Sequence, residues 1–136
     1  MASLSEGRMW LNDKQPVPVF LNSTVYLPNI PTKVIWSGGV RPALPMGLEV
    51  LQWKKHFVWL KVDGTAPKLL VYIDYSATGY VLSDFALSAQ PILSINAAGS
   101  YVANLGVPDH AYAMLRLVGD VANGPNTTAL VVLGGE

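Results

Sequence analysis

Short segments rich in β-branched and aromatic residues recur along the chain, and glycine, proline or asparagine bounds each of them. The i, i+3, i+4, i+7 apolar spacing of an amphipathic helix is nowhere sustained, and the best helical candidate, residues 109–115, fits a strand better. About eight to ten short strands with frequent turn signals are typical of a β-sandwich or a β-barrel. We therefore predict an all-β fold, an antiparallel β-sandwich, and among sandwiches we favour a jelly-roll-like arrangement.

The positions of the expected strands follow from these segments. A break in the apolar alternation at Lys54-Lys55 predicts a bend or bulge between two strands, although one long bent strand is an alternative. Two closely spaced prolines predict an irregular loop over residues 38–47. The predicted strands span residues 23–27, 32–36, 48–53, 56–62, 68–75, 80–87, 91–96, 100–105, 112–121 and 127–133.

Three turn signals predict how neighbouring strands are joined. Asp63-Gly64 indicates a tight turn, and residues 97–99 indicate a turn between two paired strands. The loop 122–126, which contains Asn-Gly-Pro-Asn, predicts a terminal β-hairpin between the last two strands.

The first 18 residues differ from the rest of the chain. Prolines at two alternate positions oppose both helix and central strand. A tryptophan in this segment removes a large apolar area from water only when it is docked in a pocket. We therefore predict an extended N-terminal arm over residues 1–18 and a single β-sandwich domain over residues 19–136. The arm residues that we expect at a protein interface are Met9, Trp10, Leu11, Pro16 and Pro18.

The composition limits the classes of partner. The 136 residues are enough for one domain, and the absence of cysteine excludes disulfides and thiolate chemistry. Nine basic and nine acidic residues give a net charge of zero, which argues against nucleic acid and anionic membranes as partners. We expect no signal peptide and no membrane span. Only 13% of the residues are charged and 51% are hydrophobic, so we expect a protein partner to cover part of the surface.

Residues that could support catalysis are few. His56 and His110 are too few for a histidine-rich metal site, and no known metal-binding or nucleophile motif is present. A carboxylate pair such as Asp74 and Asp84 could serve glycoside chemistry only if both faced one groove, and solvated aspartates near turns are the simpler interpretation. We therefore predict a protein that is not an enzyme and needs neither cofactor nor metal.

Aromatic residues on the predicted strands allow two interpretations. Two packed sheets need large side chains between them, so a core role is the simpler one. The alternative is an exposed platform that stacks sugar rings, as in carbohydrate-binding modules. The residues concerned are Trp36, Trp53, Trp59, Tyr72, Tyr75 and Tyr80.

Several features together give the chain its resemblance to a known class of protein. They are the irregular segment Met1–Pro18, the cysteine-free and weakly charged β body, the ending 111–120 with 130–135, and the lack of a catalytic site. In these features the chain resembles the capsid decoration, or cement, proteins of tailed bacteriophages. The resemblance implies a jelly-roll-like or related β domain that forms a dimer or trimer on the outside of a capsid shell and bridges neighbouring capsomers.

From this resemblance we expect a structural virion protein, made in the host cytoplasm and located on the capsid surface. Its expected partners are the major capsid protein or another virion protein, and further copies of itself. The main alternative is a carbohydrate- or receptor-binding module of a fibre or attachment protein. A small cupin-like enzyme is a weaker alternative, because cupin chemistry uses a cluster of metal-binding histidines.

Overall fold

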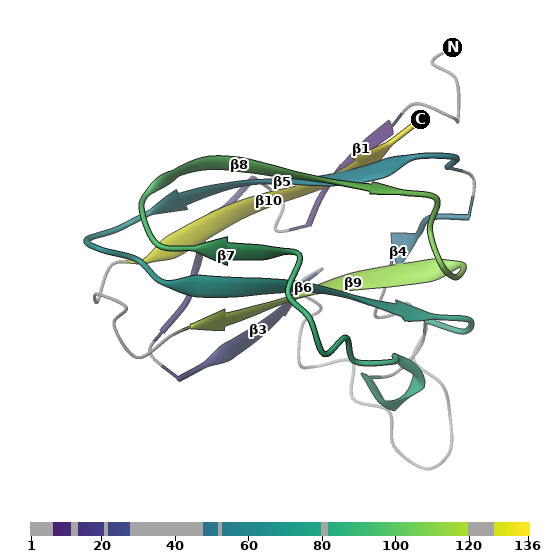
Figure 1. Ribbon diagram of the computed structural model, residues 1–136, viewed down its shortest axis with the longest axis horizontal. Helices are drawn as coiled ribbons and strands as arrows, with labels where there is room; N and C mark the ends of the chain where they lie inside the picture. Colours follow the sequence, from purple (N-terminus) through teal and green to yellow (C-terminus); the bar gives the residue numbers. More distant parts are fainter. Residues whose placement is uncertain are drawn as a thin grey trace.

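The computed structural model describes residues 7–11, 14–20, 22–27, 48–51, 53–79, 82–119 and 127–136. These residues form strands and one short 3-10 turn (Figure 1). The strands are β1 (Gly7–Trp10), β2 (Val17–Pro18), β3 (Thr24–Leu27), β4 (Leu48–Glu49), β5 (His56–Asp63), β6 (Leu69–Ser76), β7 (Leu93–Ile95), β8 (Gly99–Gly106), β9 (Tyr112–Gly119) and β10 (Thr128–Gly135), and the 3-10 turn is η1 (Leu82–Asp84).

The strands build two antiparallel sheets. In sheet A the order is β1-β10-β5-β8, and β2 also pairs with β10. In sheet B the order is β3-β9-β6-β7, and β4 also pairs with β9. Figure 1 shows the two sheets as stacked layers. The predicted all-β antiparallel sandwich is confirmed.

The apolar core lies between the two sheets. Along β5, Val58, Leu60 and Val62 are fully buried and alternate with more exposed residues, because successive side chains of a strand point to opposite faces. The same alternation places Phe57 and Trp59 on the outer face of sheet A. Members of the buried cluster that come from sheet B are Leu27, Leu69, Val71, Ile73, Ile95, Ala113, Leu115 and Leu117.

The connections between strands differ from the predicted hairpins. The predicted terminal hairpin is wrong, because β9 belongs to sheet B and β10 to sheet A. The turn at residues 97–99 likewise joins β7 of sheet B to β8 of sheet A, so these strands are not a pair. The turn after Asp63 is present, and it too crosses between the sheets. Each of these strands has one apolar face. The same sequence pattern arises whether two successive strands pair within one sheet or face each other from two packed sheets, so the pattern did not distinguish the two arrangements.

Two further predictions concern the middle of the chain. The bend at Lys54-Lys55 is confirmed, and both backbone N–H groups donate to the carbonyl oxygen of Glu136. The predicted strand over residues 80–87 is wrong for its described part, residues 82–87, where the chain forms η1 and Ala86 makes an isolated β-bridge with Tyr75. Gly79 turns the chain with a φ of +71° and lies so close to the Tyr112 ring that a Cβ atom would clash. The predicted strand 32–36 and the predicted loop 38–47 lie outside the described residues.

The N-terminal segment is part of sheet A. β1 pairs with the end of β10 and β2 with its beginning. The prediction that residues 1–18 lie outside the sandwich is therefore corrected for the described residues among them. The two prolines that argued against a central strand are compatible with this position, because β2 contains only two residues and lies at a sheet edge.

Candidate functional site

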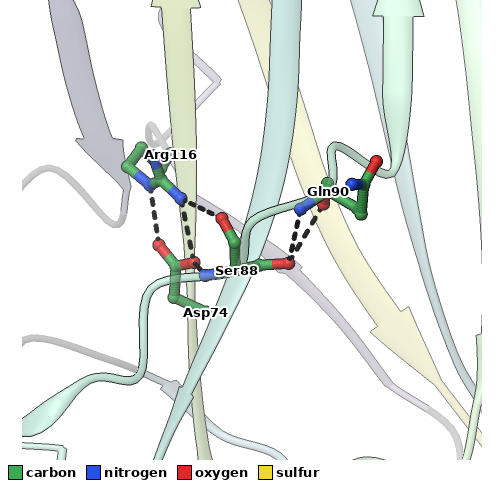
Figure 2. A network of polar contacts seen from close by, with 4 residues as sticks. All are labelled: Asp74, Ser88, Gln90 and Arg116. Atoms are coloured by element: carbon green, nitrogen blue, oxygen red, sulfur yellow. Dashed lines mark hydrogen bonds and ion pairs between the residues drawn. The ribbon is translucent and has the colours of Figure 1, made fainter.

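A partly buried ion pair crosses two neighbouring strands on the outer side of sheet B (Figure 2). Asp74 comes from β6 and is fully buried, and Arg116 comes from β9. The Arg116 Nε donates to Asp74 Oδ2 over 3.0 Å, and Nη2 donates to Oδ1 over 3.3 Å. Such a bidentate pair is stronger and more directional than a single charged hydrogen bond.

The same pair holds the segment that follows η1 against the sheet. The backbone N–H of Ser88 donates to Asp74 Oδ1 over 2.8 Å, and Arg116 Nη2 donates to the Ser88 carbonyl oxygen over 2.9 Å. Ser88 and Gln90 add two further hydrogen bonds within this segment (Figure 2). The hydrogen bond to Asp74 is the main cause that raises the pKa of Arg116, so the guanidinium stays protonated. The arrangement therefore acts as a structural clamp.

The two aspartates considered for glycoside chemistry have different surroundings. The carboxylate of Asp74 is buried, and both of its oxygens accept hydrogen bonds from Arg116 and Ser88. Asp84 lies exposed in η1, where it accepts a hydrogen bond from the Thr78 hydroxyl over 2.5 Å. The two carboxylates therefore differ both in exposure and in hydrogen-bond partners.

A row of three residues runs across the outer face of sheet B beside this clamp. Tyr26 of β3 and Tyr72 of β6 lie opposite Arg116 in the strand register. The Arg116 Cζ atom lies 4.1 Å from the centroid of the Tyr72 ring, which is a cation–π contact. Sequence reasoning included Tyr72 but missed Tyr26 and Arg116, because the alternation of each strand does not reveal which strands are neighbours.

A polar pair connects the two sheets inside the sandwich. The Nδ1 of His56 donates to the carbonyl oxygen of Gly106 over 2.5 Å, so Nε2 is the acceptor for the Tyr75 hydroxyl over 2.6 Å. The two rings meet edge to face, with centroids 5.9 Å apart. Burial lowers the pKa of His56, and burial together with the charge of Asp109 raises the pKa of Tyr75. Both groups are therefore held neutral at pH 7.

The arm residues predicted at an interface do not share one environment. Leu11 is buried in the core of its own sandwich, and its N–H donates to the Val131 carbonyl oxygen over 3.0 Å, so its assignment to an intermolecular interface is corrected. Met9 and Trp10 lie in β1, paired with residues of β10. Pro16 and Pro18 are exposed. The edge position of β1 and β2 accounts for these different environments. One side of each strand pairs with β10 of the same sheet, and the other side faces away from that sheet.

The aromatic platform considered as an alternative to a core role is not assembled by the described residues. Trp53 is buried in the core, and Tyr75 packs against the core while bonding to His56. Trp59 and Tyr72 lie on the outer faces of different sheets. Trp36 and Tyr80 lie outside the described residues.

Large apolar side chains remain exposed on the described surface. Each is more than half accessible to solvent, although the chain has few charged residues to offset them. Val102 lies on β8, and Val107 directly follows that strand. The exposed residues are Phe20 (59%), Leu51 (69%), Leu87 (57%), Val102 (52%) and Val107 (72%).

No family model matches the chain, and no curated protein is significantly similar to it. Among the described residues, no group of three or more histidine, cysteine or acidic side chains is placed to hold a metal ion. The same residues contain no helix with the length and hydropathy needed to cross a membrane.

Proposed function

We propose that this protein is a non-enzymatic structural component of a virion, a decoration or cement protein that binds the outside of a capsid shell and stabilises it through protein–protein contacts. The observation that carries the proposal is the set of five large apolar side chains exposed among the described residues, on a chain with 13% charged residues and no net charge. Such a surface favours association, and association with a larger assembly covers it.

The strand order supports this proposal, and from it we infer a jelly roll. If β1 with β2 and β3 with β4 each count as one interrupted strand, both sheets have four strands. The chain then passes from one sheet to the other at every connection except that between β6 and β7. Eight strands in two sheets connected in this way form a jelly roll, a fold that viral capsid proteins use.

The ability to stabilise a shell would depend on the rigidity of each copy and on the number of copies that bind. A closely packed sandwich transmits load with little deformation. Each copy needs only a modest interface when many copies act together on one shell. The partners would be the major capsid protein or another virion protein, and the site of action would be the capsid surface.

Binding to empty shells tests the proposal. Shells assembled from the major capsid protein of the same viral genome are mixed with the purified protein and sedimented. We expect saturable co-sedimentation and a higher melting temperature of the shell. Leu51→Lys and Phe20→Lys should weaken binding, whereas Lys61→Glu, at an exposed position on β5, is the matched control. Absence of binding at any concentration, or of the protein from purified particles, would contradict the proposal.

A carbohydrate- or receptor-binding module is the second candidate function. The row Tyr26, Arg116 and Tyr72 favours it, because aromatic rings beside a hydrogen-bond donor suit a sugar ring. The weakness of this candidate is that Arg116 already covers the Tyr72 ring. A glycan panel with Tyr26→Ala as the site variant and Tyr101→Ala as the control separates the two functions, since only a sugar site on sheet B would lose binding specifically in Tyr26→Ala.

A further inference from the structure

The strand β8 is an unusual edge strand. It forms the last position of sheet A, and no described strand pairs with its other side (Figure 1). It contains eight residues, whereas the other strands at the sheet edges, β1, β2, β3, β4 and β7, contain two to four. A long edge strand presents a row of backbone donors and acceptors that can pair with another chain.

The residues of β8 do little to prevent such pairing. Proteins protect their edge strands with charged side chains, proline or bulges. The sequence of β8, Gly-Ser-Tyr-Val-Ala-Asn-Leu-Gly, contains neither a charged residue nor proline. The register of β8 with β5 shifts only near Leu105, so residues 99–104 form a regular run.

We propose that β8 pairs antiparallel with β8 of a second copy about a two-fold axis at Val102, which joins the two copies of sheet A into one continuous sheet. The pleat restricts this pairing, because directly opposite residues must lie on the same face of the sheet. In a symmetric antiparallel pair, the two-fold axis must therefore pass through the position of one residue and not between two successive residues. Within the regular run 99–104, a centre at Val102 pairs residues 100–104, avoids the irregularity near Leu105 and covers the exposed Val102 side chain.

The side chains are compatible with this register. Ser100 lies opposite Asn104 of the second copy, which places polar beside polar. Val102 lies opposite the same residue of the second copy, so its exposed surface is covered. Val102 also pairs with Trp59 of β5, and Trp59 with Val132 of β10. The dimer thus extends this apolar row across both copies.

A second copy is the partner that this edge fits best. β8 has no charge pattern that would select a different protein, and the zero net charge of the chain causes no repulsion between two copies. Two-fold contacts between identical patches are also the commonest way in which soluble proteins associate. The inference does not depend on shell binding, because it concerns the isolated protein, and either could fail while the other holds.

Cysteine cross-linking tests the register directly, because the native chain has no cysteine. In the proposed dimer, Val102→Cys places two thiols on directly opposite residues, whose Cα atoms lie about 4.5–5.5 Å apart, within disulfide range. Val107→Cys is the matched control. It is more accessible than Val102, at 72% against 52% exposed, but residue 107 lies five positions from the axis and up to roughly 33 Å from its symmetry mate at about 3.3 Å per residue.

With diamide as the oxidant, we expect rapid covalent dimers of Val102→Cys and at least tenfold slower dimers of Val107→Cys. A mixture of Ser100→Cys and Asn104→Cys should cross-link between the two variants faster than either variant alone. Equal rates for Val102→Cys and Val107→Cys would overturn the proposal.

Sedimentation velocity of the unmodified protein gives the independent measurement. We expect a concentration-dependent shift from monomer to dimer. Val102→Lys should abolish the dimer, because two lysines would face each other, while Ser94→Lys on the exposed edge strand β7 should leave it unchanged. Circular dichroism confirms that both variants are folded. A strict monomer at every concentration, or a dimer that survives Val102→Lys, would refute the pairing.

Discussion

His56 of sheet A accepts a hydrogen bond from the Tyr75 hydroxyl of sheet B, with 2.6 Å between Nε2 and the oxygen. The second ring nitrogen of His56 is used by Gly106, so the tautomer is set. The pair satisfies two polar groups within the interior of the sandwich and joins its two layers. The contribution of this hydrogen bond to the free energy of unfolding can be measured with substitutions that leave the apolar core unchanged.

Tyr75→Phe should lower the free energy of unfolding by about 1–3 kcal/mol, because the buried Nε2 of His56 loses its donor. The control is Tyr101→Phe, whose hydroxyl donates to the Ala97 carbonyl oxygen in an exposed position. Its loss should be below about 1 kcal/mol, since water can replace that bond. Urea unfolding of both variants gives the comparison, and equal losses would show that the bond between the sheets has no special role.

Stability should fall as the pH falls below 6.5, the ordinary pKa of histidine. Burial lowers the pKa of His56 in the folded state, so its contribution to stability is complete above pH 6.5. Between 6.5 and the lowered pKa the unfolded state binds a proton that the folded state does not, and the free energy of unfolding decreases. Below the lowered pKa this group no longer adds to the slope. Urea unfolding between about pH 4.5 and 8 should show a weaker dependence of the free energy of unfolding on pH in His56→Gln than in the unmodified protein.

Arg116→Ala should destabilise the protein by about 3 kcal/mol, because it leaves the buried carboxylate of Asp74 without its charged partner. The exposed pair of Lys55 and Glu136, 4.0 Å apart, provides the control. Lys55→Ala should cost below about 1 kcal/mol. Thermal and urea unfolding measure both, and similar losses for the two variants would contradict the clamp.

Gly134→Ala should destabilise the sandwich although the backbone there needs no unusual conformation. A Cβ atom at Gly134 would lie 2.3 Å from Cζ of Phe57 on the neighbouring strand, so the ring must move. We expect a loss of about 1–3 kcal/mol. Phe57→Leu should reduce that loss when the two substitutions are combined. A double-mutant cycle by urea unfolding checks the coupling, and additive losses would argue against the contact.

Deleting residues 2–11 should lower the stability of the whole domain, in contrast to the behaviour of an independent arm. The deletion removes β1 and the buried Leu11, and it exposes the edge of β10. Loss of one buried leucine alone costs about 2–5 kcal/mol. Deleting residues 2–6 provides the control. Calorimetry should show a large fall in melting temperature only for the longer deletion, and unchanged melting would restore the arm interpretation.

Strand positions were predicted best where local pattern alone determines them. The alternation along 56–62 and 68–75 matches β5 and β6 closely, and the bend at Lys54-Lys55 is present. The segment 80–87 misled the prediction because side-chain hydrogen bonds turn the chain before and within it. The backbone N–H groups of Thr78 and Gly79 donate to the Ser76 hydroxyl oxygen, and the Thr78 hydroxyl donates to Asp84. The clamp was missed in the same way, since Asp74 and Arg116 are 42 positions apart.

The sequence by itself determined that the chain forms short strands with one apolar face, and that this weakly charged protein must pack two such sheets. Only the tertiary structure decided which strands are neighbours. The physical reason is that a period of two specifies the face that a strand buries but not the strand beside it. That choice placed β10 between β1 and β5, joined Arg116 to Asp74 across β9 and β6, and left β8 at the edge of its sheet.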